Sequence, residues 1–337
     1  MKLSKLLALT VVLGLVIFFA ISFLAGFDKI YEVLLQADYK FIFVAICFQV
    51  LSVVTLFLRW DLVVRYCKLK IAGTRLFMIT LAGIAFSHLM PSSRMGGEPV
   101  RAYFLRNETK KSTSICLSTI IVERIFDAVT FSIISLFVLL SIFLFWNLPL
   151  WIIALLLVAF LIAIAMLVAI VYVSINKKVG TRIVMWFFRK FQRFLSRWKT
   201  ATQWERKLRK DVLLYTESVA GMIRRKHLWA YGFGFSLLAW IFDIFRTYFI
   251  FVALGSNVSL LVIGGAIIIA ALAGAIPISP GGLGLIEAAM IVVFASAGIP
   301  ITIAGMVTII DRLISYWGLT FIGLIPSYYL GIKNYKA

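Results

Sequence analysis

"PISPGGLGLIEA", Pro277–Ala288, is the stretch that decides the fold. It interrupts one of the most apolar parts of the chain with prolines, glycines and a lone glutamate. Proline removes a backbone donor and ends a helix, and glycine adopts conformations that other residues avoid. At membrane depth, backbone that leaves the helix is tolerated only where it is buried in protein or faces a wet cavity. The stretch therefore indicates a helix that breaks inside a membrane, next to a polar site.

The composition of the whole chain supports a membrane location. Of its 337 residues, 63% are hydrophobic, and the mean hydropathy is +1.04. Soluble domains are only about 45–50% apolar. Several apolar runs reach about 18 residues, the length that crosses a hydrocarbon core, whereas a β-barrel would show short alternating segments. We therefore expect an all-α polytopic membrane protein.

Several other classes of protein find no support in the sequence. The three cysteines are scattered without a CxxC pair, the two histidines lie far apart, and no phosphate-binding glycine loop is present. We therefore predict no metal site and no cofactor. The net charge of +20 comes from Lys and Arg that concentrate between apolar runs. This placement is typical of cytoplasmic loops, and it argues against nucleic acid as a partner.

The apolar runs and the charges between them predict about six full spans and two re-entrant helical hairpins. The first hairpin is short and basic on both flanks, so it enters from the cytoplasm, and the second enters from outside. The alternative for the first is a plain short span, which would invert the sidedness of everything downstream. Both termini are then cytoplasmic. We expect spans at 6–26, 41–58, 114–146, 150–173, 229–254 and 301–330, and hairpins that start at 76 and 260.

The two broken segments resemble one another. Met90–Ala102, "MPSSRMGGEPVRA", and Ile276–Ala289, "IPISPGGLGLIEAA", both place Pro, Ser, Gly-Gly and Glu in that order. Arg59 precedes the first proline of one segment by about 32 residues, and Arg246 precedes that of the other by about 31. An acid–arginine pair follows each glutamate: Glu123-Arg124 about 25 residues after the first, and Asp311-Arg312 about 24 after the second. Because the two hairpins enter from opposite sides, the repeat has inverted topology. This architecture is common in transporters, where paired breaks mark the substrate site.

The repeat divides the chain into four parts. Residues 1–40 are a first span and an outside amphipathic segment, and 41–146 are the first repeat unit. Residues 147–228 are a connecting span and a basic cytoplasmic linker, and 229–337 are the second repeat unit. The expected hairpin tips are Pro91, Gly96, Gly97, Pro277, Ser279, Pro280, Gly281, Gly282 and Gly284.

Charged residues are expected near the bilayer midplane. Glu123 and Asp311 each lie about ten residues into a span, which is roughly 15 Å of helix. A charge there costs at least about 2.5–3.5 kcal/mol, so it should be paired or face a wet cavity. The expected headgroup-binding residues are Arg94, Arg101, Arg124 and Arg312; those that balance or relay charge are Glu98, Glu123, Asp127, Glu287 and Asp311. The alternative is an ion-pair network that only locks helices together.

The linker contains an amphipathic segment, Thr181–Trp198. Its aromatic and aliphatic residues share one helical face, and its basic residues lie mostly opposite. Such helices lie in the membrane interface and attract anionic headgroups. The alternative is a cytoplasmic anchor without a role in substrate binding. The expected lipid contacts are Arg182, Arg189, Lys190, Arg193 and Arg197.

Four motifs in this order resemble the flippase-like transmembrane family of lysylphosphatidylglycerol synthase. They are "MPSSRMGGEPVRAYFLR", "IIVERIFDAV", "IPISPGGLGLIEAAM" and "IIDRLISYW", and the resemblance covers about residues 5–330. The first motif departs from the family's pattern by Pro99 after the glutamate and Arg94 within the loop. The resemblance implies movement of a phospholipid or a lipid-linked polar group across the bilayer. Bifunctional members add a soluble lysine-transferring domain, which we do not expect here because the chain ends at Ala337.

The leading hypothesis is therefore a lipid flippase-like transporter in the cell membrane, not an enzyme. Its partner would be a membrane phospholipid or lipid-linked substrate, with a separate lipid-modifying enzyme as a further partner. One alternative is a membrane component of lipid-headgroup modification, for which His88 is the only suitably placed histidine. Others are a protein that handles polyprenyl-phosphate sugars and a non-transporting partner of a synthase.

Overall fold

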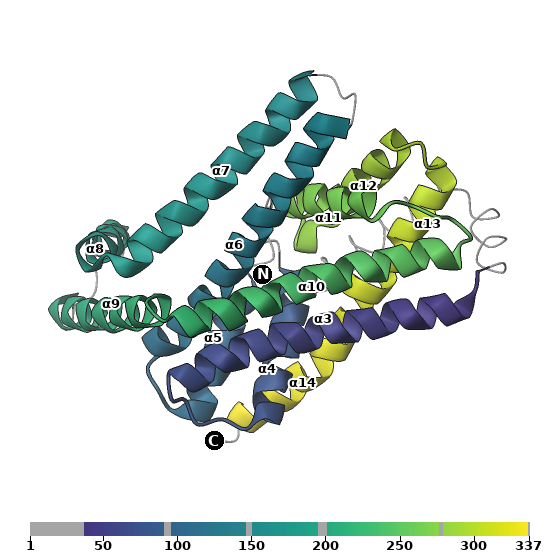
Figure 1. The fold of residues 1–337 in the computed structure, drawn as a ribbon. Coiled ribbons are helices and arrows are strands. Elements are labelled where there is room, and N and C mark those ends of the chain that lie inside the picture. The colour runs from purple at the N-terminus through teal and green to yellow at the C-terminus, as the bar shows by residue number, and fades with distance from the viewer. Residues whose placement is uncertain (1–36, 91–95, 146–149, 195–200, 276–278, 336–337) are drawn as a thin grey trace.

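A computed structural model describes residues 37–90, 96–145, 150–194, 201–275 and 279–335 (Figure 1). Within these ranges all regular structure is helical. The predicted span at 6–26, together with Pro91, Arg94, Arg197 and Pro277, lies outside the described residues. The helices are α3 Tyr39–Tyr66, α4 Gly73–Leu89, α5 Gly97–Thr109, α6 Thr113–Phe145, α7 Leu150–Ile175, α8 Lys177–Phe194, α9 Ala201–Ile223, α10 Lys226–Ala253, α11 Leu260–Gly274, α12 Leu285–Ser296, α13 Ile301–Arg312 and α14 Leu319–Tyr335.

Four helices in the described part of the chain are long and apolar enough to cross a membrane. They are α3, α6, α10 and a continuous run, Ile301–Gly331, that joins α13 to α14 through a π-helical segment. A fifth candidate is the end of α7 with α8, although these helices meet at an angle of 97°. The all-helical, multi-pass character is therefore confirmed. The count of long spans is four or five, compared with the six expected from the whole sequence.

Helices α3 and α10 lie antiparallel along much of their length (Figure 1). At one end the amide of Asp38 donates to the carbonyl of Ala253 at 2.9 Å. Phe48 stacks on Phe249 with ring centroids 5.3 Å apart, and Tyr66 approaches His227 at the other end. These two helices form a centre against which α4, α6, α9, α11 and α13 pack.

The second predicted span was expected to end at residue 58, with Arg59 in a cytoplasmic loop. That expectation is wrong, because α3 continues to Tyr66 and Arg59 is completely buried. A buried guanidinium is tolerated when carboxylates pair with it. Glu123 and Asp127 of α6 form ion pairs with Arg59. Hydropathy along the chain contains no information about such pairing between distant residues, so the end of the span was placed too early.

The two broken segments each form a pair of short helices that pack against one another, α4 with α5 and α11 with α12. In the second pair, Gly281, Gly282 and Gly284 have φ of +55°, +75° and +85°. L-residues with side chains rarely adopt this left-handed region, so glycine is required there. In the first pair, glycine serves close approach instead, since a Cβ on Gly97 would lie 1.8 Å from the carbonyl oxygen of Gly83.

Replacing Gly97 with alanine is expected to lower the free energy of unfolding by about 3 kcal/mol, because α4 and α5 must separate to admit the methyl group. Thermal unfolding in detergent measures this. Gly221→Ala is the matched control, because a Cβ at Gly221 of α9 would meet nothing within 4 Å. If Gly97→Ala unfolded at the temperature of Gly221→Ala, the close crossing of α4 and α5 would be wrong.

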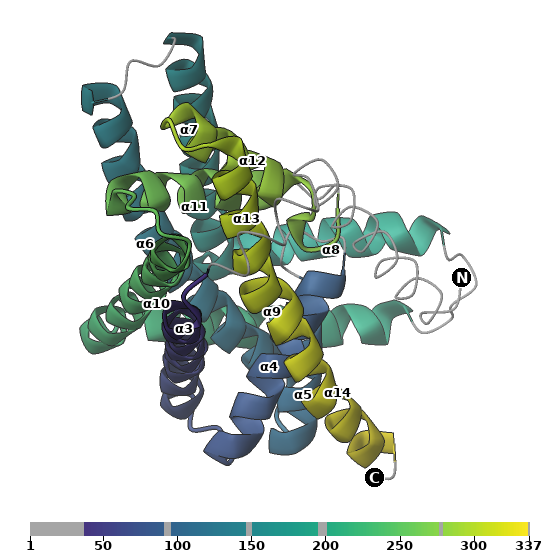
Figure 2. The same ribbon diagram turned by 90° about the vertical axis from the view of Figure 1, so that its right-hand side faces the viewer.

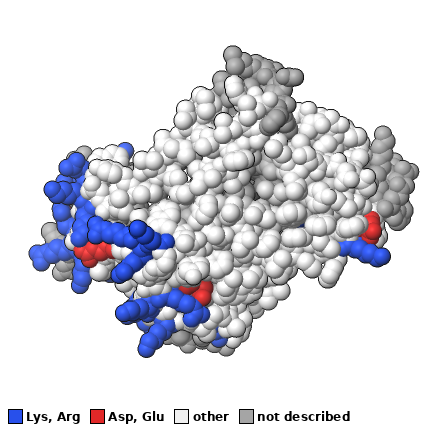
Figure 3. Space-filling model, in the orientation of Figure 1, with Lys and Arg blue, Asp and Glu red and all other residues white. Residues whose placement is uncertain are grey.

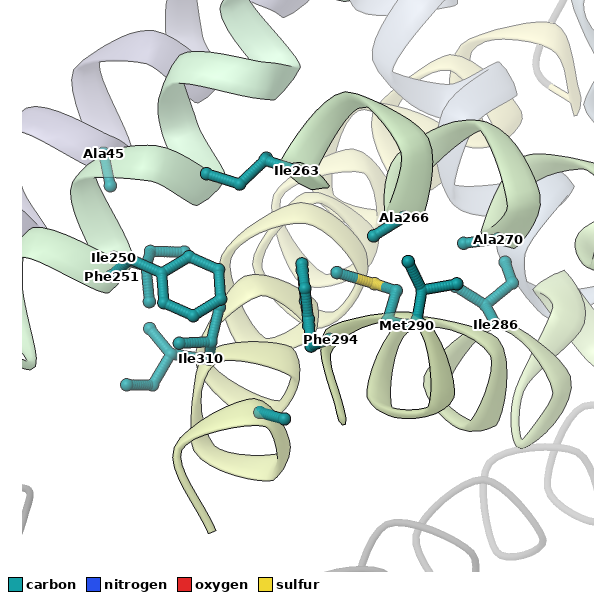
Figure 4. Close-up of a cluster of buried hydrophobic side chains, with 13 residues drawn as sticks. Ala45, Ile250, Phe251, Ile263, Ala266, Ala270, Ile286, Met290, Phe294 and Ile310 are labelled. Atoms are coloured by element: carbon teal, nitrogen blue, oxygen red, sulfur yellow. The ribbon is translucent and has the colours of Figure 1, made fainter. Parts of the chain in front are cut away.

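A large apolar cluster fixes the second hairpin onto the central helices (Figure 4). Phe294 of α12 meets Phe251 of α10 edge to face, with ring centroids 4.9 Å apart. Ile286 and Met290 of α12 lie with Ala270 of α11 in the same cluster. On the opposite side of the molecule, α14 packs along α4 (Figure 2). Each hairpin is thus packed against a long helix.

The charged surface residues are concentrated at one end of the molecule. On the face in Figure 3, Lys and Arg gather over α8, α9 and the neighbouring ends of the lower helices, and most of the remaining surface is uncharged. An uncharged belt with a basic end is what a bilayer and the positive-inside rule require. The linker that was expected between 176 and 227 is folded into α8 and α9, and these pack on one another.

Candidate functional site

A network of buried ion pairs joins α3 to α6. Arg59 donates from Nε and Nη2 to Glu123, at 3.1 and 2.5 Å, and from Nη1 to Asp127 at 2.8 Å. The same Nη1 donates to the hydroxyl of Ser236 on α10, also at 2.8 Å. Glu123 and Asp127 are one helical turn apart and share a face, as the sequence predicted. The network lies where α3, α6 and α10 meet.

A second network has the same design farther along the α3–α10 pair. Arg246 of α10 donates from Nε to Asp311 of α13 at 2.9 Å. Its Nη1 donates to Asp243 at 2.6 Å and to the side-chain oxygen of Gln49 on α3 at 2.7 Å. Thr247 adds a hydrogen bond to Asp311 at 2.9 Å. This network lies where α10, α13 and α3 meet.

The two networks correspond position by position. Arg59 and Glu123 are 64 residues apart, and Arg246 and Asp311 are 65 apart. Each arginine also reaches across to the partner helix of the α3–α10 pair. Arg59 contacts Ser236, which lies ten residues before Arg246 on α10. Arg246 contacts Gln49, which lies ten residues before Arg59 on α3.

One further salt bridge joins each hairpin to a neighbouring helix. Arg124 of α6 donates from Nε to Glu98 of α5 at 2.5 Å, and Arg312 of α13 donates to Glu287 of α12 at the same distance. Arg124 and Arg312 are adjacent in sequence to the acidic residues Glu123 and Asp311 of their own spans. The structure pairs them mainly with the hairpin glutamates. Glu287 also accepts from the amide of Gly284 at 2.6 Å, which holds the tip of the second hairpin.

Both networks open onto one internal cavity of about 230 Å³. Residues of α3, α4, α5, α6, α10, α11, α12 and α13 line it. This is room for several waters or a small polar group. Four arginines and four carboxylates line its wall, so charge of either sign can be neutralised there. Its charged lining residues are Arg101, Glu123, Arg124, Asp127, Asp243, Arg246, Asp311 and Arg312.

Arg101 differs from the other arginines of the cavity. Its side chain is buried, and its Nη1 donates to Glu123 at 2.8 Å. Its Nε and Nη2 have no acceptor among the described residues. The guanidinium lies 3.9 Å from the ring centre of Trp60, which orients it. Buried donors without an acceptor carry a desolvation cost of about 1–3 kcal/mol each, so an anion in the cavity would satisfy them.

The second hairpin lacks this guanidinium. Arg101 follows Glu98 by three residues, and Met290 follows Glu287 by three. Among the described residues, the unpaired donor nitrogens of Arg101 therefore lie on the side of the first hairpin. Asp243 lies three residues before Arg246 on α10. The corresponding position on α3, three residues before Arg59, is Leu56, so this carboxylate has no equivalent beside Arg59. The two halves thus present different charges to the cavity.

The structure brings together most of the residues that the sequence predicted. Arg101, Arg124, Arg312, Glu123, Asp127 and Asp311 line the cavity, and Glu98 and Glu287 stand behind the arginines that they pair with. Gly96 and Gly97 begin α5, and Ser279, Pro280, Gly281, Gly282 and Gly284 form the turn before α12.

Sequence reasoning missed four site residues. Arg59 and Arg246 were noticed only as markers of the repeat, and Gln49 and Asp243 were not singled out. A usable signal existed, because a charge inside an apolar run of α10 requires a partner. The identity of that partner depends on which helices pack together, and this information is not local in the chain.

The end of α4 contacts the last span beside the second hairpin tip. His88 shares a hydrogen bond of 2.8 Å between its Nδ1 and Thr320, and its ring stacks on Tyr316 at 4.5 Å. The hydroxyl of Tyr316 donates to the carbonyl of His88 at 2.9 Å, and Gly281 packs against the Tyr316 ring. Tyr316 lies in the π-helical segment Leu313–Gly318. Such segments occur frequently at functional sites.

The basic residues of the amphipathic segment lie on α8. Arg182, Arg189 and Lys190 line a groove between α8 and α9. Arg193 lies within α8 near its end, and Arg197 falls outside the described residues. Within the described ranges, no group of three or more His, Cys, Asp or Glu side chains is arranged to hold a metal ion.

Comparisons with known proteins agree on one family. The sequence model described as the lysylphosphatidylglycerol synthase transmembrane region matches residues 7–323. A UPF0104 membrane protein of Methanothermobacter thermautotrophicus is 32% identical over 324 residues, which are 96% of this chain and 95% of the relative. UPF0104 membrane proteins of Methanocaldococcus jannaschii and Pyrococcus horikoshii are 27% and 25% identical, over 95% and 97% of this chain and 94% and 97% of theirs.

Proposed function

The chain belongs to the lysylphosphatidylglycerol synthase transmembrane family, and on this premise we propose that it is a flippase-like transporter that moves a phospholipid or lipid-linked headgroup across the bilayer. The observation that carries the proposal is the central cavity. It is lined by charged residues of both halves and contains two donor nitrogens of Arg101 that have no acceptor in the described part of the chain. A polar chamber inside an apolar helical protein is the feature that a headgroup needs to cross hydrocarbon.

The proposal includes an inverted repeat made of units 41–146 and 229–337. Its support is the matching of ion pairs between the two units. Arg59–Glu123 and Arg246–Asp311 are separated by 64 and 65 residues, and the hairpin bridges, Glu98 to Arg124 and Glu287 to Arg312, by 26 and 25. The antiparallel α3–α10 pair then contains the pseudo-twofold axis. In such transporters the halves rock about a shared central site, so the site opens to each side in turn. The hairpins α4–α5 and α11–α12 are the moving walls of the site.

We further propose the topology that the charges predicted. Six full spans, with the predicted one at 6–26 as the first, and two re-entrant hairpins place both termini in the cytoplasm of a cell membrane. The concentration of Lys and Arg over α8 and α9 supports this orientation. Residues 147–228 then connect the repeats on the cytoplasmic side.

Within the cavity we assign different roles to the two signs of charge. Arg101 and Arg124 bind the headgroup phosphate, since Arg101 has free donors and the Arg124 side chain is 35% exposed. Asp127 and Asp243 are partly exposed at the cavity wall and compensate the arginines when the headgroup leaves. Arg59 and Arg246 hold the carboxylates in place. No nucleotide or metal is required in this scheme, so transport is passive or driven by an ion gradient.

Blocking the cavity tests the transport proposal without removing a charge. Ala271 of α11 lines the cavity, and Ala271→Phe is expected to slow lipid movement at least about tenfold. The measurement uses proteoliposomes with a fluorescent phospholipid, whose inner-leaflet fraction becomes accessible to an external quencher only after it crosses. Val292→Phe on α12, whose side chain is 65% exposed, is the control and should transport normally. Wild-type rates in a folded Ala271→Phe variant would refute passage through the cavity.

A further inference from the structure

We infer that the groove between α8 and α9 is a second lipid site, separate from the central cavity, that binds a phosphomonoester lipid headgroup. The groove has a volume of about 1010 Å³. Six of its ten lining residues are cationic and none is acidic: Lys177, Lys178, Arg182, Arg189, Lys190 and Arg209.

The groove has a defined shape because ion pairs fasten it at both ends. Lys177 at the start of α8 bonds Glu217 of α9 at 2.7 Å. Near the other end, Glu205 accepts from Arg209 at 2.9 Å and lies 3.8 Å from Arg189. The hydrogen bond from Arg209 lowers the pKa of Glu205, so this contact persists at neutral and mildly acidic pH.

Between the two ends the positive charge is uncompensated. Lys178 and Arg182 stand one helical turn apart, and within the described part of the chain neither forms an ion pair with a carboxylate. Like charges at this spacing repel one another. Lys190 lies 5.1 Å from the Trp186 ring and likewise has no described carboxylate partner. Three such cations exceed what one singly charged phosphodiester neutralises, so a doubly charged phosphomonoester is the better match.

The position of α8 indicates that the ligand is a lipid. This helix turns by 97° from α7, and Asn176 caps its start through hydrogen bonds to the amides of Lys178 and Val179, both 3.1 Å. If α7 spans the bilayer, α8 lies along its surface. Trp186 and Phe187 are 55% and 62% exposed on α8. Apolar side chains beside a cationic groove contact acyl chains while the groove holds the headgroup.

The test is native mass spectrometry of the purified full chain titrated with phosphatidic acid, phosphatidylglycerol and phosphatidylcholine. We expect affinity to fall in that order. Lys178→Gln with Arg182→Gln should weaken phosphatidic acid binding by about thirtyfold, given the typical effect of two surface cations on anionic lipid binding. Lys70→Gln with Lys226→Gln is the matched control, since both lysines are exposed and lie outside the groove. This control should bind like the wild type.

Three outcomes would overturn the inference: equal losses in both double variants, which indicate general charge attraction; no loss in either; or tighter binding of soluble pyrophosphate than of phosphatidic acid, which identifies a soluble ligand. The readout is lipid binding, whereas the transport proposal is judged by lipid movement in proteoliposomes. A failure of one therefore leaves the other unaffected.

Discussion

Replacing Arg59 with methionine is expected to lower the free energy of unfolding by about 3–5 kcal/mol. The guanidinium is completely buried and bonds Glu123 and Asp127, which lose a common counter-ion when it is removed. Methionine fills much of the space but neutralises neither carboxylate. A buried charge without a partner is among the most destabilising defects of a protein interior. Unfolding by denaturing detergent in mixed micelles measures the difference.

Arg65 on the same helix provides the control. Its side chain is 67% exposed and pairs with Asp61, one turn away, at 2.5 Å. Exposed pairs of this kind are worth about 0–1 kcal/mol, so Arg65→Met should have nearly the stability of the wild type. If Arg59→Met were no less stable than Arg65→Met, Arg59 would lie in the loop that hydropathy predicted, and the buried network would be wrong.

Replacing Arg101 with glutamine is expected to reduce lipid movement by at least about tenfold while the protein still folds. Loss of a charge-assisted contact to an anion costs about 1.5–3 kcal/mol. Stability changes less than for Arg59, because Glu123 retains Arg59 as its counter-ion. The proteoliposome assay measures the rate, and the unfolding midpoint in detergent shows that the variant is folded.

The conservative variant Arg101→Lys separates charge from geometry. Lysine keeps the positive charge but loses the planar fork that holds a phosphate through two nitrogens. We expect an intermediate rate if the phosphate contact is bidentate. A folded Arg101→Gln variant that transports like the wild type would exclude Arg101 from the headgroup site.

Together these two substitutions decide between the readings of the charged residues that the sequence left open. A network that only locks helices together predicts that Arg59 and Arg101 affect stability alone. A transport site predicts that Arg101 affects the rate more than it affects stability. The structure already distinguishes the two residues. All three nitrogens of Arg59 are hydrogen-bonded, whereas two nitrogens of Arg101 have no acceptor among the described residues.

The sequence by itself determined the class of protein and the position of its breaks. Apolar length predicted the spans at α6 and α10 within a few residues, and the Pro/Gly motif correctly marked the end of α11 and the start of α12. It also identified the residue types of the site, because an acid at the expected depth of Glu123 or Asp311 requires a partner. These features are local, and both hydropathy and backbone preferences are read from neighbouring residues.

Only the tertiary structure decided which charges meet. Arg59 and Glu123 are 64 residues apart, and their pairing depends on α3 lying against α6. The contact of Arg246 with Gln49, across 197 residues, depends in the same way on the antiparallel packing of α3 and α10. Arg59 and Arg124 take up Asp127 and Glu98, and Arg101 shares only Glu123. Two nitrogens of Arg101 are therefore left without an acceptor among the described residues. Electrostatic energy depends on distance in space, and separation along the chain does not determine that distance for residues on different helices.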